Sequence, residues 1–183
     1  MSFVRFATTQ ALFEAFPDLS RTIKVEPTEQ PPIDFVRSLV TAGKLPEAVA
    51  FCAHLLPRRE AVWWACVSAR TLTEEIARTR PPGLLVAEAW VFQPDTENRQ
   101  RALDIGERSD ENDPTTWLAR AAAWSGGTQT IGGQAAPMPP YMTARASRIA
   151  ILLSASRIRS HERTPRLRTC IAEAIKLAQQ GIG

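Results

Sequence analysis

Arg58-Arg59-Glu60-Ala61-Val62-Trp63-Trp64-Ala65-Cys66-Val67-Ser68-Ala69-Arg70 sets two adjacent tryptophans in an apolar run between charged ends. Neighbouring positions on a helix point about 100° apart, so Trp63 and Trp64 cannot lie on one face. A helix that is apolar nearly all round is buried on several sides. The segment therefore predicts a central core helix against which the rest of the chain packs.

Helical patterns flank this segment on both sides, and no segment shows the alternation of a strand. Thr8 or Thr9, Asp34 and Asp113 are suitable capping residues, and Pro114 suits a first helical position. The connections are only a few residues long, so adjacent helices should pack antiparallel or at steep angles. We predict helices over residues 8–23, 35–42, 46–56, 71–80, 84–92, 94–108, 114–124, 141–159 and 165–180, besides the helix that starts at Arg58.

The predicted fold class is all-α, a single domain of packed antiparallel helical hairpins that form an irregular helical array. Residues 1–32 form a short N-terminal helix and a proline-rich linker, and residues 33–124 form the helical core. Residues 125–140 hold four glycines and three prolines and are expected to be a loop. Residues 141–183 form a basic pair of C-terminal helices packed on the same domain.

The charge of the chain is unevenly distributed. The net charge is +3, with +6 from Tyr141 onward and −3 over the first 140 residues. We predict that the basic part binds an acidic partner, although a solvated helical face would have the same composition. The expected partner-binding residues are Arg145, Arg148, Arg157, Arg159, Arg163, Arg166 and Arg168.

Several classes of protein receive no support from the sequence. The apolar runs are too short for a transmembrane helix and the N-terminus lacks a signal-peptide stretch, so we expect a cytoplasmic protein. Cys52, Cys66 and Cys170 lack metal-binding spacing and lie among apolar residues, so buried reduced thiols are expected. We predict no catalytic residues, no cofactor and no metal site.

Two titratable residues in apolar surroundings leave an enzymatic role open. His54 follows Phe51-Cys52-Ala53, and we interpret it as a hydrogen-bonded core or boundary residue. Glu88 lies between apolar neighbours, so it needs a partner such as Arg70, Arg120 or the Arg58-Arg59 pair, or else a raised pKa. The glycines of residues 125–140 lack the lysine of a phosphate-binding loop.

Several stretches resemble an uncharacterised bacterial family, a domain of unknown function. The most specific is Leu56-Pro57-Arg58-Arg59-Glu60-Ala61-Val62-Trp63-Trp64-Ala65, and the others are residues 31–37, 51–55, 87–91, 122–127 and 139–146. Such proteins occur beside bacterial type VI secretion genes. The resemblance implies an accessory or adaptor role and brings no catalytic residues to this chain.

The leading functional hypothesis is a non-enzymatic protein-interaction module, an adaptor or accessory protein of a type VI secretion system. One alternative is a small helical enzyme that uses Glu88, His54 or a cysteine. A less favoured alternative is a nucleic-acid-binding protein that uses the C-terminal arginines, for which no recognition motif is present.

Overall fold

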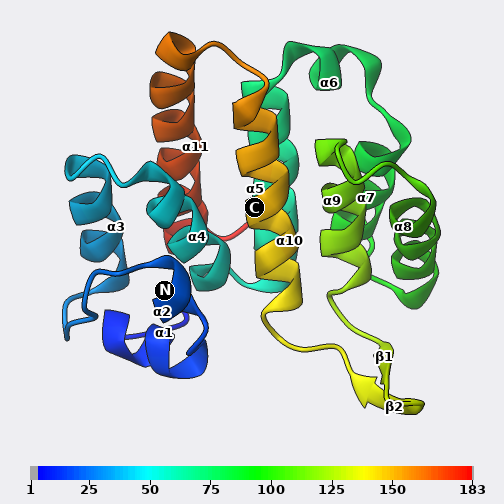
Figure 1. Cartoon of the computed structure of the whole chain (residues 1–183), viewed down its shortest axis with the longest axis horizontal. Helices are drawn as coiled ribbons and strands as arrows, with labels where there is room; N and C mark the ends of the chain where they lie inside the picture. The colour runs from blue at the N-terminus through cyan, green and yellow to red at the C-terminus, as the bar shows by residue number, and fades with distance from the viewer. Residues whose placement is uncertain (1–3, 183) are drawn as a thin grey trace.

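The computed structural model describes residues 4–182, within which the chain forms eleven helices and one short β-hairpin (Figure 1). The all-α prediction is confirmed. In chain order the elements are α1 (Thr9–Ala15), α2 (Leu19–Thr22), α3 (Pro32–Thr41), α4 (Leu45–Leu55), α5 (Arg58–Leu72), α6 (Glu74–Thr79), α7 (Pro82–Phe92), α8 (Thr96–Arg108), α9 (Pro114–Ala123), β1 (Thr128–Ile131), β2 (Gln134–Pro137), α10 (Met142–Ser156) and α11 (Ser160–Gln180).

The tryptophan helix α5 is the centre of the fold, as predicted. It packs against α10, α11, α7 and α9. Trp64 is fully buried, and its indole N–H donates a 2.7 Å hydrogen bond to the carbonyl oxygen of Cys170 in α11. Trp63 points elsewhere and is only partly buried, with its ring edge-on to Phe92 at 5.9 Å between centroids. The two neighbours therefore bury different sides of one helix.

The remaining helices lie around α5 in three groups. Helices α7, α8 and α9 pack against one another on one side, and α1 to α4 lie on the other (Figure 1). Helices α10 and α11 run in opposite directions and both pack on α5 and α4 (Figure 1). Gly83 lets α7 approach α9, because a Cβ atom there would clash with the carbonyl oxygen of Thr115.

Two helix starts have the capping side chain that the sequence predicts. Asp113 accepts the backbone N–H of Thr115 at 2.8 Å, and the Thr8 hydroxyl oxygen accepts the backbone N–H three residues on at 3.1 Å. The prediction that Asp34 caps its helix is wrong. That helix starts two residues earlier, at Pro32, because proline is suited to the first turn, and Asp34 lies inside it.

Two predicted helices differ in extent. Residues 8–23 form two helices, α1 and α2, and Pro17 lies between them. Helix α11 starts at Ser160, ahead of Pro165, instead of at the proline. Its first turn is held by tertiary contact, because the Arg163 Nε donates to the carbonyl oxygen of Ala155 at 2.9 Å. A contact between helices thus decides a boundary that the local sequence places elsewhere.

The segment 125–140, expected to be a loop, contains the antiparallel hairpin of β1 and β2. Ile131 pairs with Gln134, which leaves a two-residue turn at Gly132 and Gly133. Both glycines have positive φ, 56° and 80°, as this type of hairpin turn requires. The Gly-Gly pair is a sequence signal for a hairpin turn, but the short polar strands on either side lack the apolar alternation by which strands are predicted.

Candidate functional site

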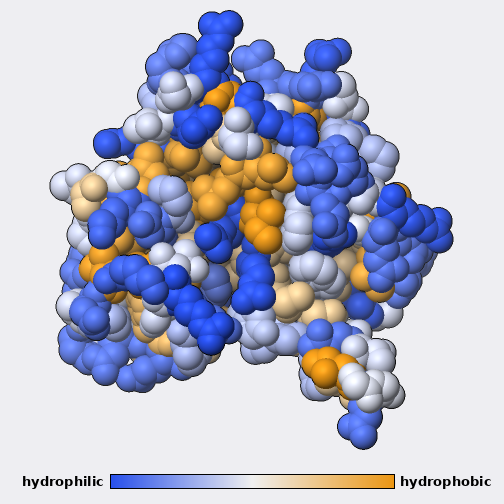
Figure 2. All heavy atoms as spheres, in the orientation of Figure 1, coloured by the Kyte–Doolittle hydropathy of each residue, from blue (hydrophilic) through white to orange (hydrophobic). Residues whose placement is uncertain are grey.

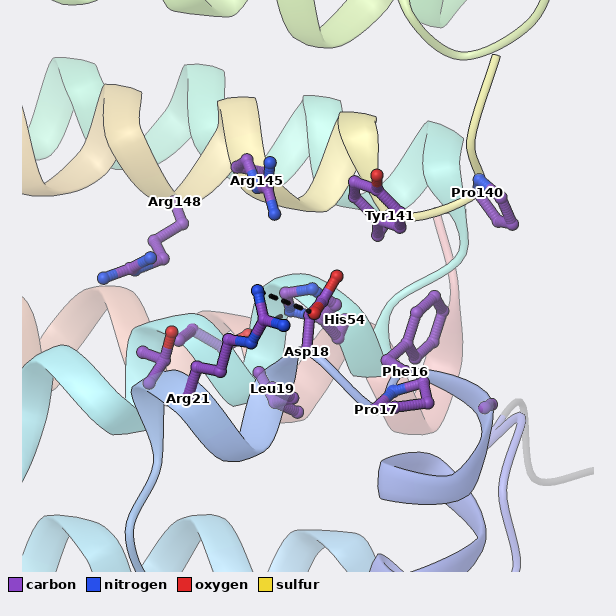
Figure 3. A pocket seen from close by; sticks show the side chains of 13 residues that line it. Phe16, Pro17, Asp18, Leu19, Arg21, His54, Pro140, Tyr141, Arg145 and Arg148 are labelled. Carbon is purple, nitrogen blue, oxygen red and sulfur yellow. Dashed lines mark hydrogen bonds and ion pairs between the residues drawn. The ribbon is translucent and has the colours of Figure 1, made fainter. Parts of the chain in front are cut away.

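A cavity of about 280 Å³ lies between α2, α4 and α10, and α4 forms its floor (Figure 3). Phe16, Asp18 and Arg21 line it from the N-terminal part of the chain, and Arg145 and Arg148 line it from α10. The other lining residues are Ala15, Pro17, Leu19, Thr22, Ala50, His54, Pro140 and Tyr141. Segments far apart in the sequence therefore meet at this site.

His54 occupies the floor of the cavity as a neutral imidazole. Its Nδ1 lies 2.7 Å from the carbonyl oxygen of Ala50, and because a carbonyl only accepts, Nδ1 carries the proton. Burial lowers the pKa of His54 to about 4, and the charges of Arg148 and Arg145 lower it further against the opposing effect of the Ala50 hydrogen bond. The Nε2 atom therefore has a free lone pair at neutral pH.

The two arginines of α10 at this cavity form no ion pair with a described carboxylate. Neither the Arg145 nor the Arg148 side chain makes a hydrogen bond or ion pair with another described residue, although the Arg145 guanidinium carbon lies 4.8 Å from the centroid of the Tyr141 ring. Burial and the charge of Arg145 lower the pKa of Arg148, and Glu47 partly opposes them. The buried Nε of Arg148 has no hydrogen-bond partner among the described residues. The pair is thus a positive charge at a concave surface that Glu47 compensates only in part.

The nearest carboxylate that lines the cavity is already engaged. Asp18 pairs with Arg21 at 3.5 Å on the side opposite α10 (Figure 3). In the same view, the side chains of Arg145 and Arg148 extend from α10 in different directions rather than converging on one point (Figure 3). The positive charge is therefore spread along the cavity.

A second cavity of about 360 Å³ adjoins the first, and the two share Phe16, His54 and Pro140 as lining residues. Arg5 and Arg58 line the second cavity. Burial, and then the charge of Arg58, lowers the pKa of Arg5, and the charge of Glu60 partly opposes them. We call the two cavities together the basic cleft, with Arg145 and Arg148 at one end and Arg5 and Arg58 at the other.

The arginines at the second end are anchored to the backbone. Arg5 donates to the carbonyl oxygen of Leu56 at 3.0 Å, and Arg58 donates to that of Ser125 at 2.8 Å. Carbonyl oxygens carry no full charge, so both guanidinium groups retain their net charge and have further N–H groups that can donate. This end of the basic cleft is therefore positive and held in place.

Three other arginines after residue 140 donate hydrogen bonds to backbone carbonyl oxygens of the chain. Arg163 and Arg166 donate to backbone carbonyl oxygens at the ends of α10 and α5, the latter at 3.4 Å from both Thr71 and Leu72. Arg157 donates to the carbonyl oxygen of Asn112 at 2.7 Å. Contacts of the kind made by Arg163 and Arg166 stabilise helix C-termini, where partial negative charge collects.

Only two of the seven predicted partner-binding arginines lie at the basic cleft. The side chains of Arg159 and Arg168 are exposed and make no hydrogen bond or ion pair with other described residues. The structure thus divides the seven into a cleft pair, three backbone-bound residues and two solvated ones. Arg5, Arg21 and Phe16, which the sequence did not single out, complete the cleft from the N-terminal segment.

The other residues considered for chemistry have structural surroundings. Glu88 is buried and pairs with Arg70, one of its expected partners, with Arg80 at 3.9 Å from its second oxygen. Burial raises the pKa of Cys52 and of Cys66 to about 12, so both thiols stay protonated at neutral pH. All three cysteines are buried and free, as expected.

Two kinds of feature are absent from residues 4–182. His, Cys, Asp and Glu side chains do not gather there in groups of three that could hold a metal ion. None of the helices in this range combines the length and the apolar character that crossing a membrane requires.

Comparison with known families finds a match over most of the chain. The model of a family described as "Family of unknown function (DUF6931)" matches residues 35–178. The chain belongs to this family. In this DUF6931 protein the matched region contains His54, Arg58, Arg145 and Arg148, whereas Arg5, Phe16 and Arg21 precede it. No curated protein and no solved structure matches the chain.

Proposed function

We propose that this DUF6931 protein is a non-enzymatic protein-interaction module that binds an acidic partner at the basic cleft. The observation that carries the proposal is the pair Arg145 and Arg148, which face a cavity and have no described carboxylate within ion-pair distance. An ion pair with the partly buried Arg148 guanidinium would offset its desolvation, and exposed Arg145 would add a weaker attraction, so an acidic ligand is bound favourably.

The contacts of the other candidate groups do not favour the catalytic alternative. Cys52 and Cys66 are protonated thiols in the core, and Glu88 is neutralised by Arg70. A nucleic-acid surface would favour a continuous row of free arginines, but Arg163 and Arg166 are bound to the chain's own carbonyl oxygens. An acidic protein surface needs only the localised charge of the cleft.

The resemblance to a family encoded beside type VI secretion genes indicates the kind of partner. We propose an acidic component of that secretion system, bound in the cytoplasm, with this chain acting as an adaptor or accessory protein. Electrostatic complementarity of this kind would speed association and select acidic partners over basic ones.

The test is affinity capture from the native host with tagged wild-type protein and two charge-reversal variants. Arg145→Glu with Arg148→Glu changes the cleft, and Arg159→Glu with Arg168→Glu makes the same change in net charge at exposed positions outside it. We expect a specific partner that the cleft variant loses and the control variant keeps. A partner kept by both, or lost by both, would contradict the proposed site.

A further inference from the structure

We infer that the basic cleft binds an extended segment of the partner in which an apolar side chain is flanked on both sides by aspartate or glutamate. The inference rests on the proposed function and adds the chemistry of the ligand. Three features of the cleft support it: positive charge at both ends, an apolar middle, and a free hydrogen-bond acceptor in the floor.

The charge at the two ends comes from different parts of the chain. Arg145 and Arg148 face the first cavity, and Arg5 and Arg58 face the second. Asp18 is the carboxylate that lines the cleft, and it is paired with Arg21. A ligand with a single negative charge would leave one end uncompensated, so acidic residues at both ends of the segment fit better.

The middle of the cleft is the part that both cavities share. Phe16 and Pro140 provide apolar surface there, and the ring of His54 meets Phe16 edge-on at 5.1 Å between centroids. His54 is neutral at pH 7, because its pKa is lowered to about 4. An apolar side chain between the acidic residues would be removed from water at this point, which favours binding.

The acceptor in the floor distinguishes a peptide from a small anion. His54 Nδ1 is committed to Ala50, so the unprotonated Nε2 can only accept a hydrogen bond. An extended peptide presents backbone N–H groups that can donate to it, whereas a fully deprotonated anion such as sulfate has no N–H or O–H group to donate. The different directions of Arg145 and Arg148 also suit successive carboxylates along a chain better than a single ion (Figure 3).

Figure 2 shows a separate apolar area between α10 and α11 on the same face of the molecule. Arg145 and Arg148 lie three residues apart on α10, so they are neighbours on the surface of that helix. The basic cleft lies on this side of α10.

The test uses a fluorescein-labelled, acetylated peptide with a pair of glutamates on each side of a central leucine, and measures anisotropy against the full chain. We expect binding that weakens about tenfold or more in the variant Arg145→Glu with Arg148→Glu. The variant Arg159→Glu with Arg168→Glu should change affinity less than about threefold. Circular dichroism melting curves confirm that both variants fold.

Changes in the peptide test the two ends and the middle without altering the protein. Replacing the glutamates on one side with glutamine should weaken binding several-fold, and replacing them on both sides should abolish most of it. Replacing the leucine with serine should weaken binding about tenfold, because the buried apolar surface is lost. Equal affinity for the leucine and serine peptides would overturn the inferred apolar middle.

Other outcomes separate this inference from the proposed function. No binding of the probe by a wild-type protein that captures its partner through Arg145 and Arg148 would overturn the inference and leave the proposed function standing. Competition by inorganic phosphate at concentrations equal to the peptide would also overturn it, and would assign the site to small anions. A dimer in sedimentation that the cleft variant loses would instead place a second copy in the cleft.

Discussion

The neutral state of His54 predicts an acid-sensitive component of stability. In the unfolded chain the imidazole takes up a proton near its ordinary pKa of 6.5, whereas the folded chain holds it neutral until about pH 4. The unfolded state therefore binds more protons between these values, so stability is intact above pH 6.5 and falls as the pH falls toward 4. The full separation corresponds to at most about 3 kcal/mol.

We expect a smaller effect, because the ring borders the cleft and solvent there screens the neighbouring charges. Between pH 7 and pH 4.5 the wild type should lose about 1–2 kcal/mol of unfolding free energy more than His54→Gln. Urea denaturation of both proteins at the two pH values measures this difference. The His54→Gln side chain lacks the titrating group but keeps an amide N–H that can donate to a carbonyl oxygen.

Nuclear magnetic resonance gives an independent reading of the same group. His54 and His161 are the two histidines of the chain, so a His161→Gln variant leaves one imidazole signal to assign and titrate. We expect its midpoint near pH 4. A midpoint near 6.5, together with equal pH dependence in wild type and His54→Gln, would refute the account of a desolvated ring beside two arginines.

Three further substitutions, together with one exposed control, test the packing. Trp64→Ala removes a fully buried indole and should lower the free energy of unfolding by about 3–5 kcal/mol in urea denaturation. Arg166→Gln weakens the contact with the end of α5, removes the ion pair with Glu162 at 3.2 Å and should cost about 1 kcal/mol, whereas exposed Arg168→Gln should change stability by less than about 0.5 kcal/mol. Gly83→Ala forces a methyl group against Thr115 and should cost about 1–3 kcal/mol, measured as a lower melting temperature.

Each of these stability predictions can be contradicted by a specific measurement. Wild-type stability of the Trp64 variant would mean that α5 is not the core helix. Equal losses from the Arg166 and Arg168 changes would show that the backbone contacts of Arg166 contribute nothing specific. An unchanged melting temperature for Gly83→Ala would mean that α7 and α9 lie farther apart than in the structure.

The helices could be predicted where local chemistry and burial agree. Trp63 and Trp64 mark the central helix because no single face can bury both, and Asp113 with Pro114 marks a start that needs no distant contact. Prediction failed where tertiary contact overrides local preference. Helix α11 extends ahead of Pro165 because Arg163 anchors its first turn to the end of α10.

The candidate site was predicted only in part. The sequence located Arg145 and Arg148 within a basic region, and His54 was interpreted as a core or boundary residue with a hydrogen bond, which it makes. The sequence could not separate these arginines from Arg163 and Arg166, because all four have the same side chain and similar helical neighbours. Arg163 and Arg166 donate to backbone carbonyl oxygens, whereas Arg145 and Arg148 line a cavity that residues from other segments complete.

Composition and periodicity alone establish the helical class, the central tryptophan helix and the excess of positive charge after residue 140, because each of these is a property of one continuous segment. Which of the positive charges lack a partner depends instead on the tertiary structure. It follows from how α2, α4 and α10 come together around Phe16 and His54, and charge compensation between distant segments leaves no pattern in any one of them.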